Sequence, residues 1–348
     1  MSGSDAAIEV LKAGLLDTVQ DAGRPGQARI ALSRGGAMDR GALALANALV
    51  GNAPDAAGLE ITGPGPTLRF ACDAWIASVG ARHTVTLLPD GGGAGATPVA
   101  SRRPVFVTAG SVLRWQAPPV GWRSWIAVAG GLAMPAVLGS RSAHLAAGIG
   151  SGRLAAGRRL PLAAQAATLA RRRAAAVLGA PAPGNPRRWP PWLLAEDLPP
   201  GWPEIDLPVL AGRHFGLLSD AARESLFAQA WTVGAQSNRQ GLRVHGQPID
   251  TGGLPQLASE PVSVGTVQLP PAGEPVILLT EHQTTGGYPR ILEVASAAES
   301  LLAQAGAGCR IRLRLIGLDE ADALARRAAR ALSLRLAGVR RACAHPIE

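Results

Sequence analysis

Residues 280–290 hold the widest variety of reactive side chains in the chain. The segment combines a carboxylate (Glu281), an imidazole (His282), an amide and three threonines with Tyr288, the one tyrosine among 348 residues. A carboxylate or an imidazole can act as a general acid or base, while amides, hydroxyls and a phenol can hold a polar substrate. We therefore predict catalytic roles for Glu281 and His282, and substrate binding by Gln283, Thr284, Thr285 and Tyr288.

This segment directly follows an apolar run, residues 275–279, which predicts a buried strand. The pair Gly286-Gly287 then predicts a backbone turn that a residue with a Cβ would resist. Because sites are commonly built where loops leave a rigid scaffold, the segment is predicted to form one wall of a binding site. The alternatives are a polar hairpin tip without chemistry and a histidine that only makes a hydrogen bond.

A second cluster, residues 17–24, ends a short strand and enters a glycine turn. It supplies Asp21 as a further catalytic candidate, and Gln20 and Arg24 as binding candidates. The planar Arg24 guanidinium matches the two oxygens of a carboxylate. That carboxylate belongs either to a substrate or to Asp21 in an internal salt bridge, and the sequence favours neither.

The third cluster opens a helix that is predicted over residues 39–50. Glycines precede this helix, so its first N–H groups can bind an anion unless Asp39 accepts from them as an ordinary helix-start residue. The helix-start interpretation is favoured, and Asp39 is kept as a binding candidate. Asn47 lies two turns further on among apolar residues, where it needs partners and is expected to clamp a neighbouring loop or to contact substrate.

The fourth and fifth clusters lie in the second half of the chain. Two arginines four residues apart, Arg239 and Arg243, flank Gly241 and suit a carboxylate, a phosphate or a carboxylated cofactor, while a surface turn is the equal alternative. Glu260 precedes a later strand and is most simply a surface charge. The binding candidates from these two clusters are Ser237, Asn238, Arg239 and Gln268.

The chain contains a single lysine, Lys12, which limits the cofactors it can hold. Lys12 has neither the glycine-rich context of a phosphate loop nor the Met-Lys-Met setting of biotin attachment. We therefore predict no covalently bound cofactor, and we expect ATP or carboxybiotin to reach the reaction through another polypeptide. The three cysteines are widely spaced, so neither a disulfide framework nor a metal site is expected.

The elements that would position these residues are mainly short β segments separated by glycine and proline. Many short strands with regular turn signals predict a sandwich or barrel rather than a parallel sheet. Further helices are predicted over residues 220–228, 297–305 and 319–336.

A proline-rich stretch, residues 181–191, predicts an extended connector, with a long loop inside one domain as the alternative. We therefore expect an N-terminal domain over residues 1–190 and a C-terminal domain over residues 191–348.

Composition argues against several classes of protein. The formal charge is +9, yet aromatic residues make up only 4% of the chain and do not interleave with the arginines, so stacking on nucleic-acid bases is poorly supported. The longest apolar runs are too short to span a bilayer, and the first residues lack the basic start and apolar core of a signal peptide. We expect a cytoplasmic protein without a nucleic-acid or membrane partner.

Together the motifs resemble the allophanate hydrolase subunit 2 family, also called the biotin-dependent carboxyltransferase or Kip-A-type family. Their order and spacing cover nearly the whole chain, although Glu281 stands where the family usually has Asp. The matching motifs are residues 18–24, 36–39, 46–47, 59–66, 129–131, 138–141, 152–154, 237–246, 267–270 and 283–289.

This resemblance implies two cyclophilin-like β-barrel domains with a few helices. It also implies a partner of the Kip-I type (allophanate hydrolase subunit 1), with the active cleft largely at the junction of the two subunits. The favoured function is a subunit of an ATP-dependent 5-oxoprolinase complex, inactive alone, which hydrolyses 5-oxo-L-proline to L-glutamate with a third, hydrolase-like subunit.

Two other functions remain open from the resemblance. One is a carboxyltransferase subunit that acts on urea or a related amide with carboxybiotin from a partner. The other is a non-enzymatic regulator that binds a Kip-I-type kinase inhibitor.

Overall fold

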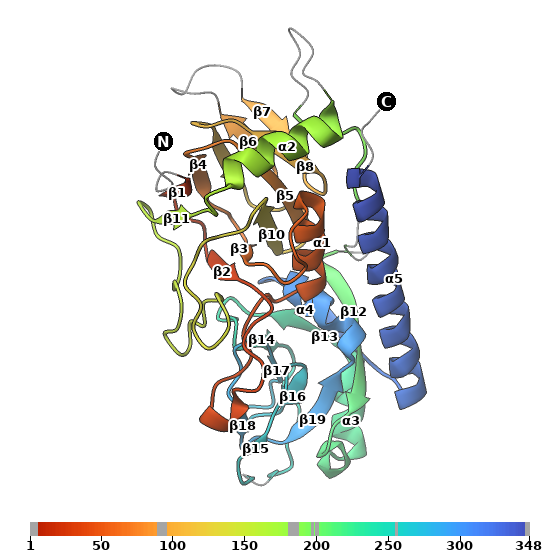
Figure 1. Cartoon of the computed structure of the whole chain (residues 1–348). Helices are drawn as coiled ribbons and strands as arrows, with labels where there is room; N and C mark the ends of the chain where they lie inside the picture. The colour runs from red at the N-terminus through yellow and green to blue at the C-terminus, as the bar shows by residue number, and fades with distance from the viewer. Residues whose placement is uncertain are drawn as a thin grey trace.

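Two β-sheets build the first half of the protein, and a closed β-barrel builds most of the second half (Figure 1). The computed structural model describes residues 6–88, 96–179, 188–195, 198, 202–254 and 257–344. Most of the predicted connector at residues 181–191 lies outside this part of the chain. The expected mainly β fold with a few helices is confirmed, and its closed barrel lies in the second half.

The sheets of the first half have six and five strands, and their strands pair antiparallel. The six-stranded sheet comprises, in spatial order, β11 (Arg159–Pro161), β1 (Ala7–Lys12), β4 (Thr67–Phe70), β9 (Val112–Trp115), β6 (Val85–Leu88) and β7 (Thr97–Val99). The five-stranded sheet comprises β2 (Thr18–Gln20), β3 (Gly58–Thr62), β10 (Arg123–Val128), β5 (Ala74–Gly80) and β8 (Pro104–Val107).

Strand β10 shows how the sequence sets the layers of this half. Ile126 and Val128 point into the core between the two sheets, while Trp125 and Ala127 point to the opposite face and join a second core. Successive side chains of a strand face opposite sides, so a strand with apolar residues on both faces must be covered on both. The second face is covered by α1 (Arg40–Val50) and α2 (Ala166–Leu178).

Helix α1 begins and ends as its sequence predicts. Its N-cap is Asp39, whose Oδ1 accepts a hydrogen bond from the Ala42 N–H at 2.9 Å. Gly51 ends the helix with a φ of 75°, a left-handed conformation in which glycine meets no Cβ penalty. Between these ends the helix is almost entirely buried, and Asn47 is 0% exposed. Asp39 therefore acts first as a helix cap.

The second half closes into a seven-stranded barrel with one parallel pair, β12 with β20. In order around the barrel the strands are β12 (Glu204–Ala211), β19 (Arg290–Val294), β16 (Thr266–Gln268), β17 (Val276–Leu278), β14 (Gly241–His245), β13 (Ala230–Val233) and β20 (Arg310–Leu315). Outside the barrel the second half has a two-stranded sheet of β15 (Glu260–Pro261) and β18 (Thr285–Gly286). It also has the short helical elements η3 (Phe215–Leu217), α3 (Asp220–Ala228), η4 (Ser296–Ala298) and α4 (Glu299–Gln304), and the first half has η1 (Ala28–Ile30).

Two expectations from the sequence are corrected. Of the strand expected over residues 262–267, only Thr266 and Val267 lie in a strand, β16, because Gly265 just before them has a φ of 87° that regular strand does not allow. Helix α2 was not predicted, because its run of alanine and arginine lacks a clear apolar stripe.

The last helix, α5 (Leu318–Ala344), runs along one side of the molecule beside both halves (Figure 1). It follows the barrel in sequence, yet it packs on α1 and α2 of the first half. Near its C-terminal end Val339 is 3% exposed within the shared core. The domain boundary at residue 190 stays a prediction. Helix α5, which follows this boundary in sequence, packs into the core beside α1 and α2, which precede it.

Within the part of the chain that the structure describes, no helix is both long enough and apolar enough to cross a lipid bilayer.

We predict that Asn47→Ala destabilises the fold by about 1–3 kcal/mol, because three partners of a buried amide are lost. Asn47 Nδ2 donates to the Ala56 carbonyl at 2.8 Å and to the Pro54 carbonyl at 3.4 Å, and its Oδ1 accepts from Asn52 at 3.1 Å. Urea unfolding would measure the loss. Gln165→Ala, which removes an exposed amide that makes no cap hydrogen bond, is the control. Equal stability of the two variants would contradict the clamp.

Candidate functional site

A buried arginine, Arg239, joins the two halves of the protein. It is 2% exposed and comes from the turn before β14 in the barrel. Its Nη1 pairs with Glu60 on β3 of the first half, and its Nε donates to Glu281 Oε1 at 2.6 Å. Its Nη2 donates to the Gly36 carbonyl at 2.6 Å. One guanidinium thus bridges two carboxylates that lie 221 positions apart in the sequence.

Glu281 is held on all sides. It is 1% exposed; its Oε1 accepts from Arg239, and its Oε2 accepts the backbone N–H groups of Leu145 at 2.8 Å and Ala146 at 3.1 Å. A carboxylate whose two oxygens are both occupied by donors fixes the segments that donate to it. In this arrangement Glu281 organises the site, and its catalytic role stays a prediction.

Glu60 closes the other end of the bridge. Its Oε2 accepts from the Met38 N–H at 2.8 Å and from Trp125 Nε1 at 3.0 Å, and Arg123 Nε lies 3.9 Å from its Oε1. Burial lowers the pKa of Arg123 to about 10, although the neighbouring Glu60 acts to raise it. Sequence reasoning did not identify Glu60 as a site residue. The signal that could have identified Glu60 in the sequence is a single carboxylate between two apolar residues of a buried strand.

Asp21 lies in a nest of donors from the loop after Leu138. Its Oδ1 accepts from Ser140 Oγ at 2.6 Å and Ser142 Oγ at 2.5 Å, and its Oδ2 accepts from the Arg141 N–H at 2.6 Å. Asp21 therefore ties the glycine turn after β2 to this second loop. Because both of its oxygens are occupied, Asp21 is badly placed to take a proton from a substrate.

Arg24 lies between the two carboxylates, Asp21 and Glu281. It is 1% exposed, and Nη2 donates to the Ser142 carbonyl at 2.6 Å. Burial lowers the pKa of Arg24, while Asp21 and Glu281 act to raise it. Within the described residues its Nε and Nη1 have no hydrogen-bond partner. Among the described residues no ion pair joins Arg24 to Asp21, so the internal salt bridge and the contact with a substrate both stay predictions.

His144 is a further member of this network that the sequence did not reveal. Its Nδ1 accepts from the Ala147 N–H at 3.2 Å, and its Nε2 lies 2.9 Å from Ser33 Oγ. Burial lowers the pKa of the ring, so we assign His144 as neutral near pH 7, with the proton on Nε2. His144 thus ties its own loop to the loop that carries Ser33, and its Nδ1 lies 3.8 Å from Glu281 Oε2.

Gln268 and Gln283 form a second polar feature beside this network. Gln283 Nε2 donates to Gln268 Oε1 at 3.2 Å, and Gln268 is 2% exposed. Among the described residues the Gln268 Nε2 has no partner. A Cβ at position 286 would overlap this nitrogen. Gly286 is therefore required for space: neither it nor Gly287 has a positive φ, which corrects the expectation of a glycine turn.

Gln268 Nε2 lies directly against the backbone of Gly286, in the space that a Cβ of residue 286 would otherwise occupy. A buried N–H donor normally has a partner, and a carbonyl oxygen of an amide or a carboxylate would supply one. Gln283, which donates to the oxygen of the same Gln268 amide, is exposed. The pair is therefore the part of the predicted wall that offers a donor to an amide-like substrate.

The other residues of the predicted wall lie around this pair. His282 is 9% exposed; its Nδ1 lies 2.6 Å from the Gln283 carbonyl and burial lowers the pKa of its ring, so it is assigned as a neutral donor. Thr284 is half-buried, Thr285 is exposed on β18, and Tyr288 is 45% exposed. The wall is polar and accessible on its outer side.

Three remaining candidates serve local structure. Gln20 is 0% exposed, and its Nε2 donates to the Ala143 carbonyl at 3.1 Å. Ser237 and Asn238 shape the turn before β14: Ser237 Oγ accepts from the Arg243 N–H at 3.1 Å, and Asn238 Oδ1 accepts from the Gln240 N–H at 2.8 Å. These contacts orient Arg239.

Glu260, interpreted from the sequence as a surface charge, pairs with Arg290 at the start of β19. Asp39 and Asn47 belong to α1 and lie in the helical layer rather than in this network.

We predict that Arg239→Met lowers the free energy of unfolding by about 3–5 kcal/mol, because Glu60 and Glu281 would be left buried without a counter-charge. Arg243→Met, at an exposed position of β14, should change it by less than about 0.5 kcal/mol. Chemical unfolding would compare the two. Arg239→Lys should lose part of the stability, since an ammonium cannot reproduce the three-way fork. Wild-type stability of Arg239→Lys and Arg239→Met would contradict the bridge.

Comparison of the sequence and the fold with known proteins identifies the family of this chain. Residues 30–315 match the family described as carboxyltransferase domain, subdomain A and B. The chain is 34% identical to a 5-oxoprolinase subunit of Escherichia coli (strain K12) over 317 residues, which cover 90% of this chain and 93% of that protein. It is 30% identical to the urea amidolyase of Lachancea kluyveri over 81% of this chain but only 15% of that protein.

The solved structure of the Kluyveromyces lactis urea carboxylase has the same fold. It matches with a TM-score of 0.78 and 25% identity, covering 96% of this chain and 30% of the urea carboxylase chain. The chain thus spans nearly all of the 5-oxoprolinase subunit and a minor part of each urea enzyme. With a match that begins before α1 and ends with the last strand of the barrel, the chain belongs to the carboxyltransferase domain family, subdomains A and B.

Proposed function

We propose that this protein is a subunit of an ATP-dependent 5-oxoprolinase complex that hydrolyses 5-oxo-L-proline to L-glutamate. The observation that carries the proposal is the end-to-end match to the 5-oxoprolinase subunit of Escherichia coli, which covers 90% of this chain and 93% of that protein. A separate subunit of matching length is the form in which that relative occurs. The urea enzymes contain the same fold as a minor part of a longer chain.

The side-chain amide of Gln268 is the group that we assign to the substrate. Opening the lactam of 5-oxoproline adds water to its carbonyl carbon and breaks the ring C–N bond, so negative charge develops on the carbonyl oxygen. A pre-positioned N–H donor in a buried site stabilises such charge strongly. Gln283 donates to Gln268 Oε1, which orients the amide and leaves Nε2 as its donor end.

The remaining functions belong to partners in this proposal. ATP supplies phosphoryl-transfer chemistry, and we assign its binding to a partner because the chain's single lysine lies outside any phosphate loop. We propose a Kip-I-type subunit as the direct partner, with a third, hydrolase-like subunit. The exposed Thr285 and Tyr288 leave the outer side of the wall open to such a partner.

The proposal predicts that ATP-dependent release of glutamate from 5-oxoproline requires this chain. The chain would be co-expressed with its neighbouring gene products, the complex purified, and glutamate measured with and without this subunit and with and without ATP. We expect activity to fall to background when the subunit is omitted and to return when it is added back. Undiminished activity without the chain would overturn the proposal.

A second candidate function is a carboxyltransferase subunit that moves the carboxyl group of carboxybiotin to urea or a related amide. The observation that favours it is the fold shared with urea carboxylase at a TM-score of 0.78. The Gln268 Nε2 amide would donate a hydrogen bond to the carbonyl oxygen of urea as well as to that of a lactam. Transfer from a carboxylated biotin carrier protein to urea, assayed with this chain and its partner, separates the two functions.

We also predict that Gln268→Met reduces kcat of the assembled complex about 100-fold while leaving its assembly intact. The substitution keeps the length of the side chain but removes the N–H donor, and losing one such donor at a developing oxyanion typically costs this much. Gly286→Ala, which would place a Cβ against Gln268 Nε2 and displace the amide, should have a similar effect. Gln165→Ala on the opposite half is the control. Full activity of both site variants would remove Gln268 from the mechanism.

A further inference from the structure

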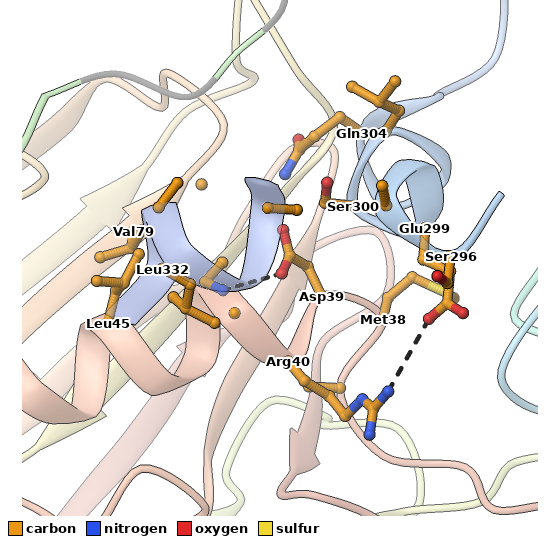
Figure 2. A pocket seen from close by; sticks show the side chains of 18 of the residues that line it. Met38, Asp39, Arg40, Leu45, Val79, Ser296, Glu299, Ser300, Gln304 and Leu332 are labelled. Atoms are coloured by element: carbon orange, nitrogen blue, oxygen red, sulfur yellow. Dashed lines mark hydrogen bonds and ion pairs between the residues drawn. The ribbon is translucent and has the colours of Figure 1, made fainter. Parts of the chain in front are cut away.

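A separate cleft of about 600 Å³ lies in the helical layer (Figure 2). It is bounded by the start of α1, by η4 and α4, and by the face of α5 that packs toward α1. Helix α5 presents the small side chains of Ala325, Ala328 and Ala329 to this space, so the helices cannot close it. The volume falls within the range of small-molecule sites.

The two ends of the cleft differ in chemistry. At one end Leu45, Val79 and Leu332 form an apolar surface, and at the other Arg40 faces Glu299 across 4.0 Å (Figure 2). Leu45 and Val79 are 1% and 4% exposed, so the apolar end is well built into the core. An occupant that satisfies both ends must have an apolar body and a charged group.

The charges of the lining favour an anion. Arg34, Arg40, Arg102 and Arg335 line the cleft against only two carboxylates, Asp39 and Glu299, among the described residues. Asp39 already accepts from the Ala42 N–H, so the helix start itself is capped and the attraction comes from the arginines. Arg34 donates through Nε to the Ala22 carbonyl at 3.0 Å, which anchors its guanidinium at the rim of the cleft.

The same two carboxylates set a limit on the charge of the occupant. A phosphate with two negative charges would meet Asp39 and Glu299 at close range, whereas a carboxylate with one charge is repelled less and still pairs with a guanidinium. Glu299 itself is half-buried, and burial raises its pKa although Arg40 and Arg34 lower it.

We propose that this cleft is a binding site for a small carboxylate with an apolar body. The carboxylate lies at Arg34 and Arg40, and the body lies on Leu45, Val79 and Leu332. This cleft is distinct from the substrate position proposed at Gln268. Thr280 is one of the residues that line the cleft. The Thr280 carbonyl accepts from the Gly35 N–H at 3.0 Å, and Thr280 precedes Glu281, so an occupant would contact the segment that anchors the Arg239 bridge.

The proposal is tested by calorimetry on the full chain with four probes. 3-Phenylpropionate has both required parts, 3-phenylpropan-1-ol lacks the charge, propionate lacks the body, and inorganic phosphate carries the charge alone. We expect 3-phenylpropionate to bind in a 1:1 ratio and at least ten-fold more tightly than the other three. Equal binding of the alcohol, or tighter binding of phosphate, would overturn the assigned chemistry.

Variants then locate the binding. Ala329→Phe, which fills the cleft, and Arg40→Met, which removes a cation, should each weaken 3-phenylpropionate at least ten-fold. The matched controls are Ala337→Phe and Arg330→Met, at exposed positions of α5 outside the cleft, which should bind as the unaltered protein does. Thermal unfolding checks that each variant is folded, and Ala328→Leu replaces Ala329→Phe if the larger residue disrupts α5. Binding that survives every cleft variant would overturn the proposal independently of any 5-oxoprolinase activity.

Discussion

The buried bridge from Glu60 through Arg239 to Glu281 is the interaction on which the rest of the structure depends. Each charge has been removed from water, and each would be costly without its partner. Because Glu60 belongs to a sheet of the first half while Arg239 and Glu281 belong to the barrel half, the bridge fixes one half against the other. Arg24 and Asp21 continue the alternation of charge into the loops beside it.

This constraint also explains the shape of the proposed site. The donors that hold Glu281 and Asp21 come from the loop segments at 140–146, so the carboxylates order backbone that lies outside the named strands. In this arrangement Asp21 and Glu281 serve as a rigid frame, and their catalytic roles stay predictions. The Gln268–Gln283 pair, which keeps a donor without a partner among the described residues, is left as the element suited to a substrate, and such preorganisation is what electrostatic catalysis requires.

Residues 280–290 connect the two binding features. Thr280 lines the cleft in the helical layer, Glu281 anchors the bridge, and Gln283 orients the Gln268 amide. A segment of four residues thus contacts the candidate substrate-binding amide, the joint between the halves and the proposed second site. This arrangement gives a physical route by which an occupant of the cleft would influence Gln268, through one short stretch of backbone.

The sequence by itself determined the mainly β class, the limits of α1 and the family, and it predicted a site at residues 280–290, because apolar periodicity, capping residues and local motifs are encoded within short windows. It also identified Asp21, Arg24, Arg239 and Glu281 as notable. Only the tertiary structure decided that these four are buried together, that Glu60 and His144 complete them, and that α5 returns to the first half. Pairing between residues some 200 positions apart leaves no local signal, since burial and a partner's position depend on how the whole chain packs.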